Sequence, residues 1–246
     1  MKRIERVGIV GFGNFGKFFA RKLATTFDVS VWDCRNFNDE AAEMSVRWST
    51  LEEVANRELV VLAVPLQSME LLLGRLTLCV NPNALLMDVC SVKQEPLRLM
   101  RKYLPQIELL GTHPLFGPQS AKDGWHGHRL VICPIAASSP KSEFMLQFLR
   151  DQGLRLFEMT AEQHDRQMAN VQALTHFIAR GLTGCEVSNS ELATTAFGHL
   201  CKVAELLGAD SWELFKTIEL GNPFAAEVRQ RFMQELENLE RRLAEQ

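Results

Sequence analysis

A glycine-rich loop near the start of the chain constrains the fold more than any other feature of the sequence. A G-x-G-x-x-G motif directly follows the apolar run 7–10 and directly precedes a helical stretch. In such a unit the first glycine permits a tight turn, the second lets a pyrophosphate approach the backbone, and the third lets the helix pack closely on the strand. The alternative is a glycine turn that binds no ligand. We expect a dinucleotide to bind the loop formed by Gly11, Phe12, Gly13, Asn14, Phe15 and Gly16.

An acidic residue follows at the spacing typical of dinucleotide-binding units. Asp33 ends the run 29–33 and lies 22 residues after Gly11. A carboxylate about 20 residues beyond the loop binds the ribose hydroxyls of NAD. The charge of Asp33 would repel the 2′-phosphate of NADP, whereas Arg35 could accommodate it. We predict NAD as the cofactor, with NADP possible; the alternative is that Asp33 is a simple turn residue.

Short β-branched runs alternate with helical stretches up to about residue 158, a pattern typical of a parallel α/β sheet. The middle runs are almost continuously apolar, as expected of strands that helices cover on both faces. We predict an α/β fold in which residues 1–159 form a doubly wound parallel sheet of the Rossmann type. The predicted strands are 7–10, 29–33, 59–64, 84–89, 108–112, 129–133 and 154–158, with helices at 14–26, 67–73, 94–103 and 142–152.

The rest of the chain is predicted to be helical. Thr160 and Gln163 have the spacing of a capping box, which predicts a helix that begins at Ala161 and ends near Gly181. Residues 160–246 are therefore expected to form a smaller all-α domain for substrate binding and dimerisation. Further helices are predicted at 191–207, from 211 to the break at 221–223, and from 224 to the end.

The last predicted helix carries an apolar stripe. Phe232, Leu236, Leu239 and Leu243 repeat at the spacing of a helix seam among charged residues. Two interpretations are equally open: the stripe joins two copies of the chain in a homodimer, or it packs on its own domain.

The net charge and the spacing of the cysteines limit the classes of partner that this chain is expected to bind. The net charge is −3, and no long run of like charges suggests a nucleic-acid partner. No apolar stretch is long enough to span a bilayer, and the six cysteines are scattered singly, without a metal-ligand spacing. We expect a cytoplasmic protein that binds a small-molecule substrate, with no metal, no nucleic acid and no membrane partner.

Candidate catalytic residues follow the predicted strands, because ligands of doubly wound sheets bind beyond the carboxyl ends of the strands. Val64 and Pro65 end one strand and are expected to lie along the cofactor, while Ser91 and His113 follow the next two strands. Oxidation of an alcohol needs a base for the hydroxyl proton, and histidine suits that role near neutral pH. Ser91 could orient the imidazole or the substrate; alternatively, it caps the following helix.

The long predicted helix after Thr160 has a polar face. His164, Met168, Gln172 and His176 recur every four residues and are expected to share that face. Gln172 and His176 lie in an apolar stretch, and buried polar groups need partners. They therefore form either a wall of the substrate site or an interdomain hydrogen bond.

At these residues the sequence resembles the prephenate/arogenate dehydrogenase family of tyrosine biosynthesis. The likeness covers nearly the whole chain in order, and the stretch 88–125 is especially similar to the short arogenate dehydrogenases of plants. The matching segments are the glycine loop, 88–93, Thr112-His113-Pro114-Leu115-Phe116-Gly117-Pro118 with Ser120, Lys122, Gly124 and Trp125, His164-Asp165-Arg166, and 172–176.

The resemblance implies an NAD(P)-dependent oxidative decarboxylation, of prephenate to 4-hydroxyphenylpyruvate or of arogenate to tyrosine. It implies that Ser91 assists His113 and that Gln172 and His176 line the substrate pocket. Many members carry an arginine on the second helix of the small domain to bind a substrate carboxylate. The stretch 193–208 has no arginine, which leaves Lys202 as the candidate. The helical domain of the family typically dimerises.

Two other classes remain open at this point. One is a β-hydroxyacid dehydrogenase or imine reductase of similar layout, although the long helix lacks the lysine that such dehydrogenases use as acid or base. The other is a non-catalytic regulator that senses a dinucleotide.

Overall fold

The computed structural model describes residues 4–134, 139–185, 190–208 and 210–245. The chain divides into two compact units, Met1–His164 and Asp165–Gln246. The division falls between His164 and Asp165 rather than at the predicted 159/160 boundary, because the first turn of the helix after residue 160 belongs with the first unit.

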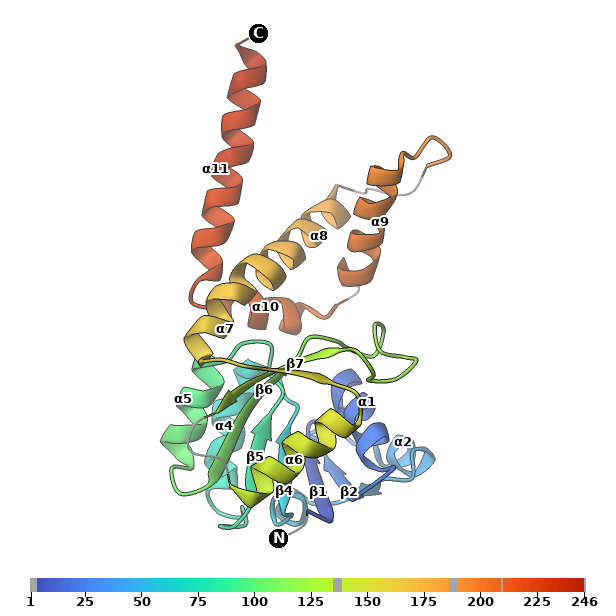
Figure 1. Cartoon of the computed structure of the whole chain (residues 1–246), viewed down its shortest axis with the longest axis vertical. Helices are drawn as coiled ribbons and strands as arrows, with labels where there is room; N and C mark the ends of the chain where they lie inside the picture. Colours follow the sequence, from blue (N-terminus) through green and yellow to red (C-terminus); the bar gives the residue numbers. More distant parts are fainter. Residues whose placement is uncertain (1–3, 135–138, 186–189, 209, 246) are drawn as a thin grey trace. The chain divides into compact units, whose positions relative to one another are not determined.

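The first unit contains an eight-stranded sheet with the order β3-β2-β1-β4-β5-β6-β7-β8 (Figure 1). The predicted doubly wound α/β sheet is therefore confirmed, with one strand that the prediction missed, β3, whose two residues are too few for a periodicity signal. The strands are β1 (Arg6–Val10), β2 (Asp28–Trp32), β3 (Arg47–Trp48), β4 (Leu59–Leu62), β5 (Leu85–Asp88), β6 (Glu108–Pro114), β7 (Arg129–Pro134) and β8 (Arg155–Glu158).

One pair of strands departs from the predicted parallel arrangement. β7 runs antiparallel to β6, whereas every other neighbouring pair is parallel. The connection 115–128 contains no helix, and a parallel pairing would need a long crossover, usually helical. The chain therefore returns beside β6 in the opposite direction, which extends β6 through His113 to Pro114.

Two apolar clusters cover the two faces of the sheet. Val61 belongs to one cluster, while its neighbours Val60 and Leu62 belong to the other, because successive side chains of a strand point to opposite faces. This double burial explains the continuous apolar runs in the sequence. The surrounding helices are α1 (Asn14–Leu23), α2 (Asn38–Glu43), α3 (Leu51–Ala55), α4 (Leu66–Leu76), α5 (Gln94–Tyr103) and α6 (Pro140–Asp151).

The predicted capping box is present at the start of the long helix. The Thr160 N–H donates to Oε1 of Gln163 at 3.0 Å, and the Gln163 N–H donates to Oγ1 of Thr160 at 3.1 Å. α7 (Ala161–Met168) then passes into a π-helical segment, Ala169–Ala173, and continues as α8 (Leu174–Gly184). The prediction that four residues share one face assumed an unbroken α-helix; the wider π turn rotates the later residues relative to the earlier ones.

The second unit is entirely helical in its described residues. α9 (Thr195–Gly208), α10 (Trp212–Gly221) and α11 (Ala225–Ala244) follow α8, and α9 runs beside α8 (Figure 1). The two helices approach closely at Gly208, where a Cβ atom would lie 2.7 Å from Oγ1 of Thr183. Within the described residues, no helix is both long enough and apolar enough to cross a bilayer.

Candidate active site

The glycine loop has the backbone geometry that its sequence predicts. Gly11 has a φ of +101°, which favours glycine, and its N–H donates to the carbonyl of Trp32 at 2.8 Å. A Cβ at Gly11 would lie 2.4 Å from the carbonyl oxygen of Ala63, and a Cβ at Gly16 would lie 2.0 Å from the carbonyl oxygen of Gly11. Both positions therefore require glycine for the packing of the protein itself.

Gly13 differs from the other two loop glycines. Among the described residues, a Cβ at Gly13 would meet nothing within 4 Å, so these residues leave space at this position. Gly13 is also the N-cap of α1, and no side chain caps that helix start. Open space beside an uncapped helix N-terminus suits the pyrophosphate of a dinucleotide. The residues present therefore fit the cofactor that the sequence predicts.

The other loop residues contribute in different ways. Asn14 is exposed, and Phe15 is half-buried against Phe19 with ring centroids 5.7 Å apart. Phe12 is fully buried, and its ring makes an edge contact with Phe37. The Phe12 side chain therefore belongs to the core, and only its backbone is available to a ligand.

Asp33 lies beside the glycine loop, as its spacing predicts. Its Oδ2 accepts from the backbone N–H of Phe12 at 2.8 Å, and its Oδ1 accepts from the N–H of Arg35 at 2.9 Å. The exposed Arg35 guanidinium lies nearby, with Nε 3.7 Å from Oδ1. Val64 also borders the loop, since its Cγ1 would lie 2.9 Å from a Cβ at Gly11, and Pro65 is the N-cap of α4.

Ser91 follows β5, and His113 lies near the carboxyl end of the adjacent strand, β6. β5 pairs with β6 in parallel, with Asp88 opposite Gly111, so both residues lie at the carboxyl ends of neighbouring strands. His113 is 3% exposed and belongs to β6 itself. Ser91 is half-buried, and the N-cap of α5 is Lys93. The alternative reading of Ser91 as a helix cap is therefore wrong.

A buried ion pair supports this edge of the sheet. Lys93 and Asp88 are both fully buried, and the Lys93 ammonium donates to the Asp88 carboxylate and, at 2.6 Å, to the carbonyl of Thr112. The carboxylate also accepts from the N–H groups of Cys90 and Thr112. Burial raises the pKa of Asp88, while the Lys93 ammonium opposes that rise. The network fixes the backbone directly before His113.

A second histidine contacts His113 in the same unit. Nδ1 of His113 lies 2.8 Å from Nε2 of His164, which is fully buried in α7. The two residues are 51 positions apart in sequence. Our sequence reasoning missed this pair and the Lys93–Asp88 pair as functional groups, because periodicity within one element does not show contacts between elements.

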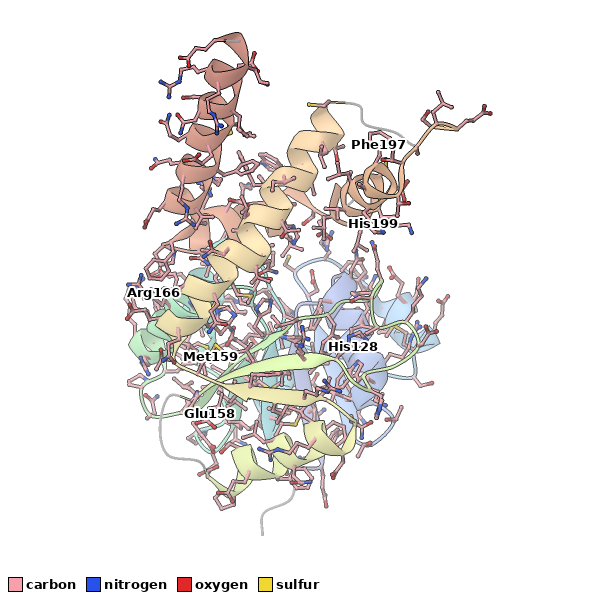
Figure 2. The ribbon with its side chains drawn as sticks, turned by 45° about the horizontal axis from the view of Figure 1, so that its top comes forward. His128, Glu158, Met159, Arg166, Phe197 and His199 are labelled. Atoms are coloured by element: carbon pink, nitrogen blue, oxygen red, sulfur yellow. The ribbon has the colours of Figure 1, made fainter. Side chains whose placement is uncertain are left out.

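The connection after His113 packs against the helix of the glycine loop. Trp125 stacks on Phe19 of α1 with ring centroids 4.9 Å apart, and Phe116 lies 6.2 Å from Phe18. His128 packs on Phe116, consistent with a structural role (Figure 2). These aromatic contacts tie the segment that follows His113 to the helix that begins at the glycine loop.

Three predicted substrate residues belong to the second unit. Gln172 has a buried Oε1 with no hydrogen-bond partner among the described residues, and Lys202 is exposed on α9. His176 is buried, with Nδ1 3.7 Å from Oδ2 of Asp210. Burial lowers the pKa of His176 to about 4, and the Arg180 guanidinium adds to this effect. His176 is therefore neutral near pH 7.

Sequence reasoning missed Arg180, which lies one helical turn after His176. Its Nη2 donates to the carbonyl of Asp210 at 2.7 Å, while its Nε is buried without a hydrogen-bond partner among the described residues. Burial raises the pKa of the Asp210 carboxyl. Because His176 is neutral near pH 7, the two residues do not form a charged pair there. The sequence feature that could have identified Arg180 is its position four residues after His176, in a largely apolar stretch.

All six cysteines are free, and burial raises the pKa of Cys90 to about 11, which suits a core residue. Among the residues that the structure describes, no three His, Cys, Asp or Glu side chains form a group that could hold a metal ion.

Comparison with protein families gives two matches. The family described as "Prephenate dehydrogenase, nucleotide-binding domain" matches residues 19–158. A second family, described as "TYRAAT1-like, C-terminal domain", matches residues 182–246. Together they cover the sheet from α1 onward and most of the helical unit.

Individual proteins give the same picture. Arogenate dehydrogenases 1 and 2 of Arabidopsis thaliana, both chloroplastic, are 32% and 30% identical over 97% of this chain. The chain spans 39% of the length of the first relative and 70% of the second. The crystal structure of prephenate dehydrogenase from Aquifex aeolicus, solved with hydroxyphenyl propionate and NAD+, has a TM-score of 0.76 at 20% identity, covering 99% of this chain and 93% of that one.

Proposed function

The chain belongs to the prephenate dehydrogenase family, and from this premise we propose that it catalyses the NAD(P)-dependent oxidative decarboxylation of prephenate or arogenate. The products would be 4-hydroxyphenylpyruvate and tyrosine, respectively. One observation carries the proposal: a buried imidazole, His113, lies at the carboxyl end of β6, next to β5, which Ser91 follows, and in the same unit as the glycine loop.

The proposed chemistry begins with a proton. His113 takes the hydroxyl proton from the 4-position of the substrate ring, and Ser91 orients that hydroxyl group. The dinucleotide that the glycine loop and Asp33 would hold would supply the acceptor for the hydride from the same ring carbon. The bond to the ring carboxylate then breaks, its electron pair enters the ring, and carbon dioxide leaves. His113 returns its proton to the ring oxygen as the ring becomes aromatic, so no net proton is gained or lost.

The cofactor preference rests on Asp33. The carboxylate lies against the glycine loop, where it can accept from the ribose hydroxyls of NAD and repel a 2′-phosphate. We therefore propose NAD as the preferred cofactor. Arg35 lies beside Asp33 and supports some acceptance of NADP.

For the second unit, we propose that Gln172, His176 and Lys202 contact the substrate. The buried Oε1 of Gln172 supports this role, because an unpaired buried acceptor is costly unless a ligand satisfies it. The neutral imidazole of His176 can donate to or accept from a substrate group without bringing a charge into a buried site. Lys202 can supply a positive charge for a carboxylate, as a point charge rather than a fork.

We also propose that the helical unit forms a homodimer. Leu236, Leu239 and Leu243 of α11 are 43%, 52% and 68% exposed. A row of large apolar side chains at seam spacing is suited to a helix of a second copy. A cytoplasmic location remains part of this proposal.

The test is an assay of the purified protein with prephenate and arogenate, each with NAD and NADP. We expect reduced nicotinamide with at least one substrate, and faster turnover with NAD than with NADP. The absence of reduced nicotinamide in all four combinations, from protein that binds NAD, would contradict the proposed reaction and favour a dinucleotide-sensing regulator.

A further inference from the structure

The proposed catalytic base, His113, makes a close side-chain contact with His164. Nδ1 of His113 lies 2.8 Å from Nε2 of His164, and the rings are inclined at 72° with centroids 5.0 Å apart. Both side chains are almost fully buried, at 3% and 0% exposure. A nitrogen–nitrogen separation of this length is a hydrogen bond, in which one ring donates and the other accepts.

We propose that His164 is a positioning residue that holds His113 in the tautomer with its proton on Nδ1. The inference rests on the proposed function, because it assigns the proton that a dehydrogenase base needs. With Nδ1–H donating to Nε2 of His164, the other nitrogen of His113, Nε2, carries a lone pair and can take the substrate proton. With the opposite donor and acceptor, Nε2 of His113 would carry a proton and could not act as a base.

The position of His164 is fixed by the start of α7. The backbone N–H of His164 donates to the carbonyl of Thr160 at 2.9 Å, and the side chain of Thr160 caps the same helix turn. His113 is fixed from the opposite side by β7, where it pairs with Val131. Two rigid elements therefore hold the two rings at hydrogen-bond distance, which is the arrangement that a positioning contact requires.

The buried Lys93–Asp88 ion pair contacts the backbone of Thr112, the residue before His113. The Lys93 ammonium donates to the carbonyl of Thr112, and the same ammonium is paired with the Asp88 carboxylate. These two charges are paired with each other and fix the strand end. The hydrogen bond to His164 involves the ring of His113 itself, so it can select a tautomer.

The contact also stabilises His113 after it has taken a proton. The imidazolium then carries N–H groups on both nitrogens, and its Nδ1–H still donates to the lone pair on Nε2 of His164. A buried cation is costly without an acceptor, so His164 offsets part of that cost. The arrangement parallels the carboxylate that orients the histidine of a catalytic triad, with an imidazole in place of the carboxylate.

The first test compares two replacements of His164. In His164→Gln the amide oxygen can accept from Nδ1–H of His113, whereas the leucine side chain in His164→Leu offers no acceptor at this position. We expect His164→Leu to lower kcat about 100-fold with KM and NAD binding changed less than about 3-fold, and His164→Gln to keep kcat within about 10-fold of wild type. The exposed residue His126 provides a control, His126→Leu, which should leave kcat unchanged.

The pH profile separates positioning from general loss of structure. The acidic limb of kcat/KM reports the ionisation of the free base. Without an acceptor the His113 imidazolium is less stable, so the limb should move to lower pH in His164→Leu and stay near the wild-type position in His164→Gln. Equal losses of kcat in both variants, or an unmoved limb in His164→Leu, would overturn the proposal.

The second test does not depend on turnover. In protein with 15N-labelled histidine, the nitrogen shifts should show His113 protonated on Nδ1 and unprotonated on Nε2, with this preference lost in His164→Leu. If the tautomer is as expected but no substrate is turned over, the positioning contact stands and the proposed reaction fails. A wild-type His113 protonated on Nε2, or the same tautomer in both proteins, contradicts the inference itself.

Discussion

The backbone N–H of Phe12 donates to Oδ2 of Asp33 at 2.8 Å, which joins the glycine loop to the acid at the end of β2. The two groups that the sequence predicts for the cofactor therefore lie in direct contact. Replacement of Asp33 by asparagine keeps an acceptor for the Phe12 N–H but removes the negative charge. We expect the ratio of kcat/KM for NAD to that for NADP to fall at least about 10-fold, because the charge no longer repels a 2′-phosphate.

The measurement is steady-state kinetics with both cofactors at saturating substrate. Replacement of the exposed residue Asp39 of α2 by asparagine provides a control with the same change in net charge. An unchanged cofactor ratio in the Asp33 variant would show that this carboxylate does not select the cofactor.

Alanine substitutions at Gly16 and Gly13 are predicted to have different effects. A methyl group at Gly16 would press on the Gly11 carbonyl, so Gly16→Ala should lower the free energy of unfolding by about 1–3 kcal/mol or more. A methyl group at Gly13 meets no protein atom, so Gly13→Ala should keep wild-type stability and weaken NAD binding. Denaturant unfolding and calorimetric titration with NAD measure the two effects. Strong NAD binding by a stable Gly13→Ala protein would argue against this loop as the pyrophosphate site.

Loss of one member of the buried Lys93–Asp88 pair is predicted to destabilise the fold more than replacement of both members. Lys93→Met leaves the Asp88 carboxylate buried without its cation, which typically costs about 3–5 kcal/mol. The double variant Lys93→Met with Asp88→Asn removes the unpaired charge and should recover part of that loss. Urea unfolding of the single and double variants checks both statements, and a double variant no more stable than Lys93→Met would contradict them.

His176 is predicted to make stability depend on pH. Its folded-state pKa is lowered from 6.5 to about 4, so the unfolded chain binds the proton more readily. The stability due to the neutral buried ring is fully present above pH 6.5 and is lost as the pH falls toward 4, by an amount on the order of 3 kcal/mol. The difference in unfolding free energy between pH 7 and pH 5 should therefore be smaller in His176→Phe than in wild type. An identical difference in both proteins would show that His176 is not the responsible group.

The exposed stripe on α11 is predicted to join two copies. Leu239→Glu places a charge within the stripe and should convert a dimer to a monomer without unfolding the chain, because Leu239 is half-exposed in the single chain. Light scattering measures the mass in solution, and Gln234→Glu, at an exposed position of the same helix, provides a control. A wild-type protein that is monomeric at high concentration would contradict the dimer.

Much of the fold and part of the site could be predicted from the sequence. The glycine loop and Asp33 can be predicted because their spacing in the sequence is local. Ser91 and His113 can be predicted because the carboxyl ends of parallel strands meet at one edge of the sheet. The antiparallel strand β7 could not be predicted from its apolar run, since the direction of a strand depends on how its connection is built. The π-helical segment 169–173 also could not be predicted, because it interrupts the α-helical period without a change in residue types.

Contacts between distant elements explain the remaining misses. His164 and His113 are brought together by the start of α7, and Arg180 meets Asp210 through the packing within the second unit. Nothing local to Lys93 in the sequence shows that Asp88 and Thr112 surround its ammonium group. The contacts of these residues can be identified only from the three-dimensional structure, because most of their partners lie far away in the sequence.

The most direct test of the central claim compares wild type with His113→Asn, measuring reduced nicotinamide, released carbon dioxide and NAD affinity in the same preparations. Wild type should yield one carbon dioxide for each reduced nicotinamide. His113→Asn should lose turnover by about 10³-fold with its NAD affinity unchanged. An asparagine variant that keeps wild-type turnover, or a wild type that reduces NAD without releasing carbon dioxide, would contradict the account.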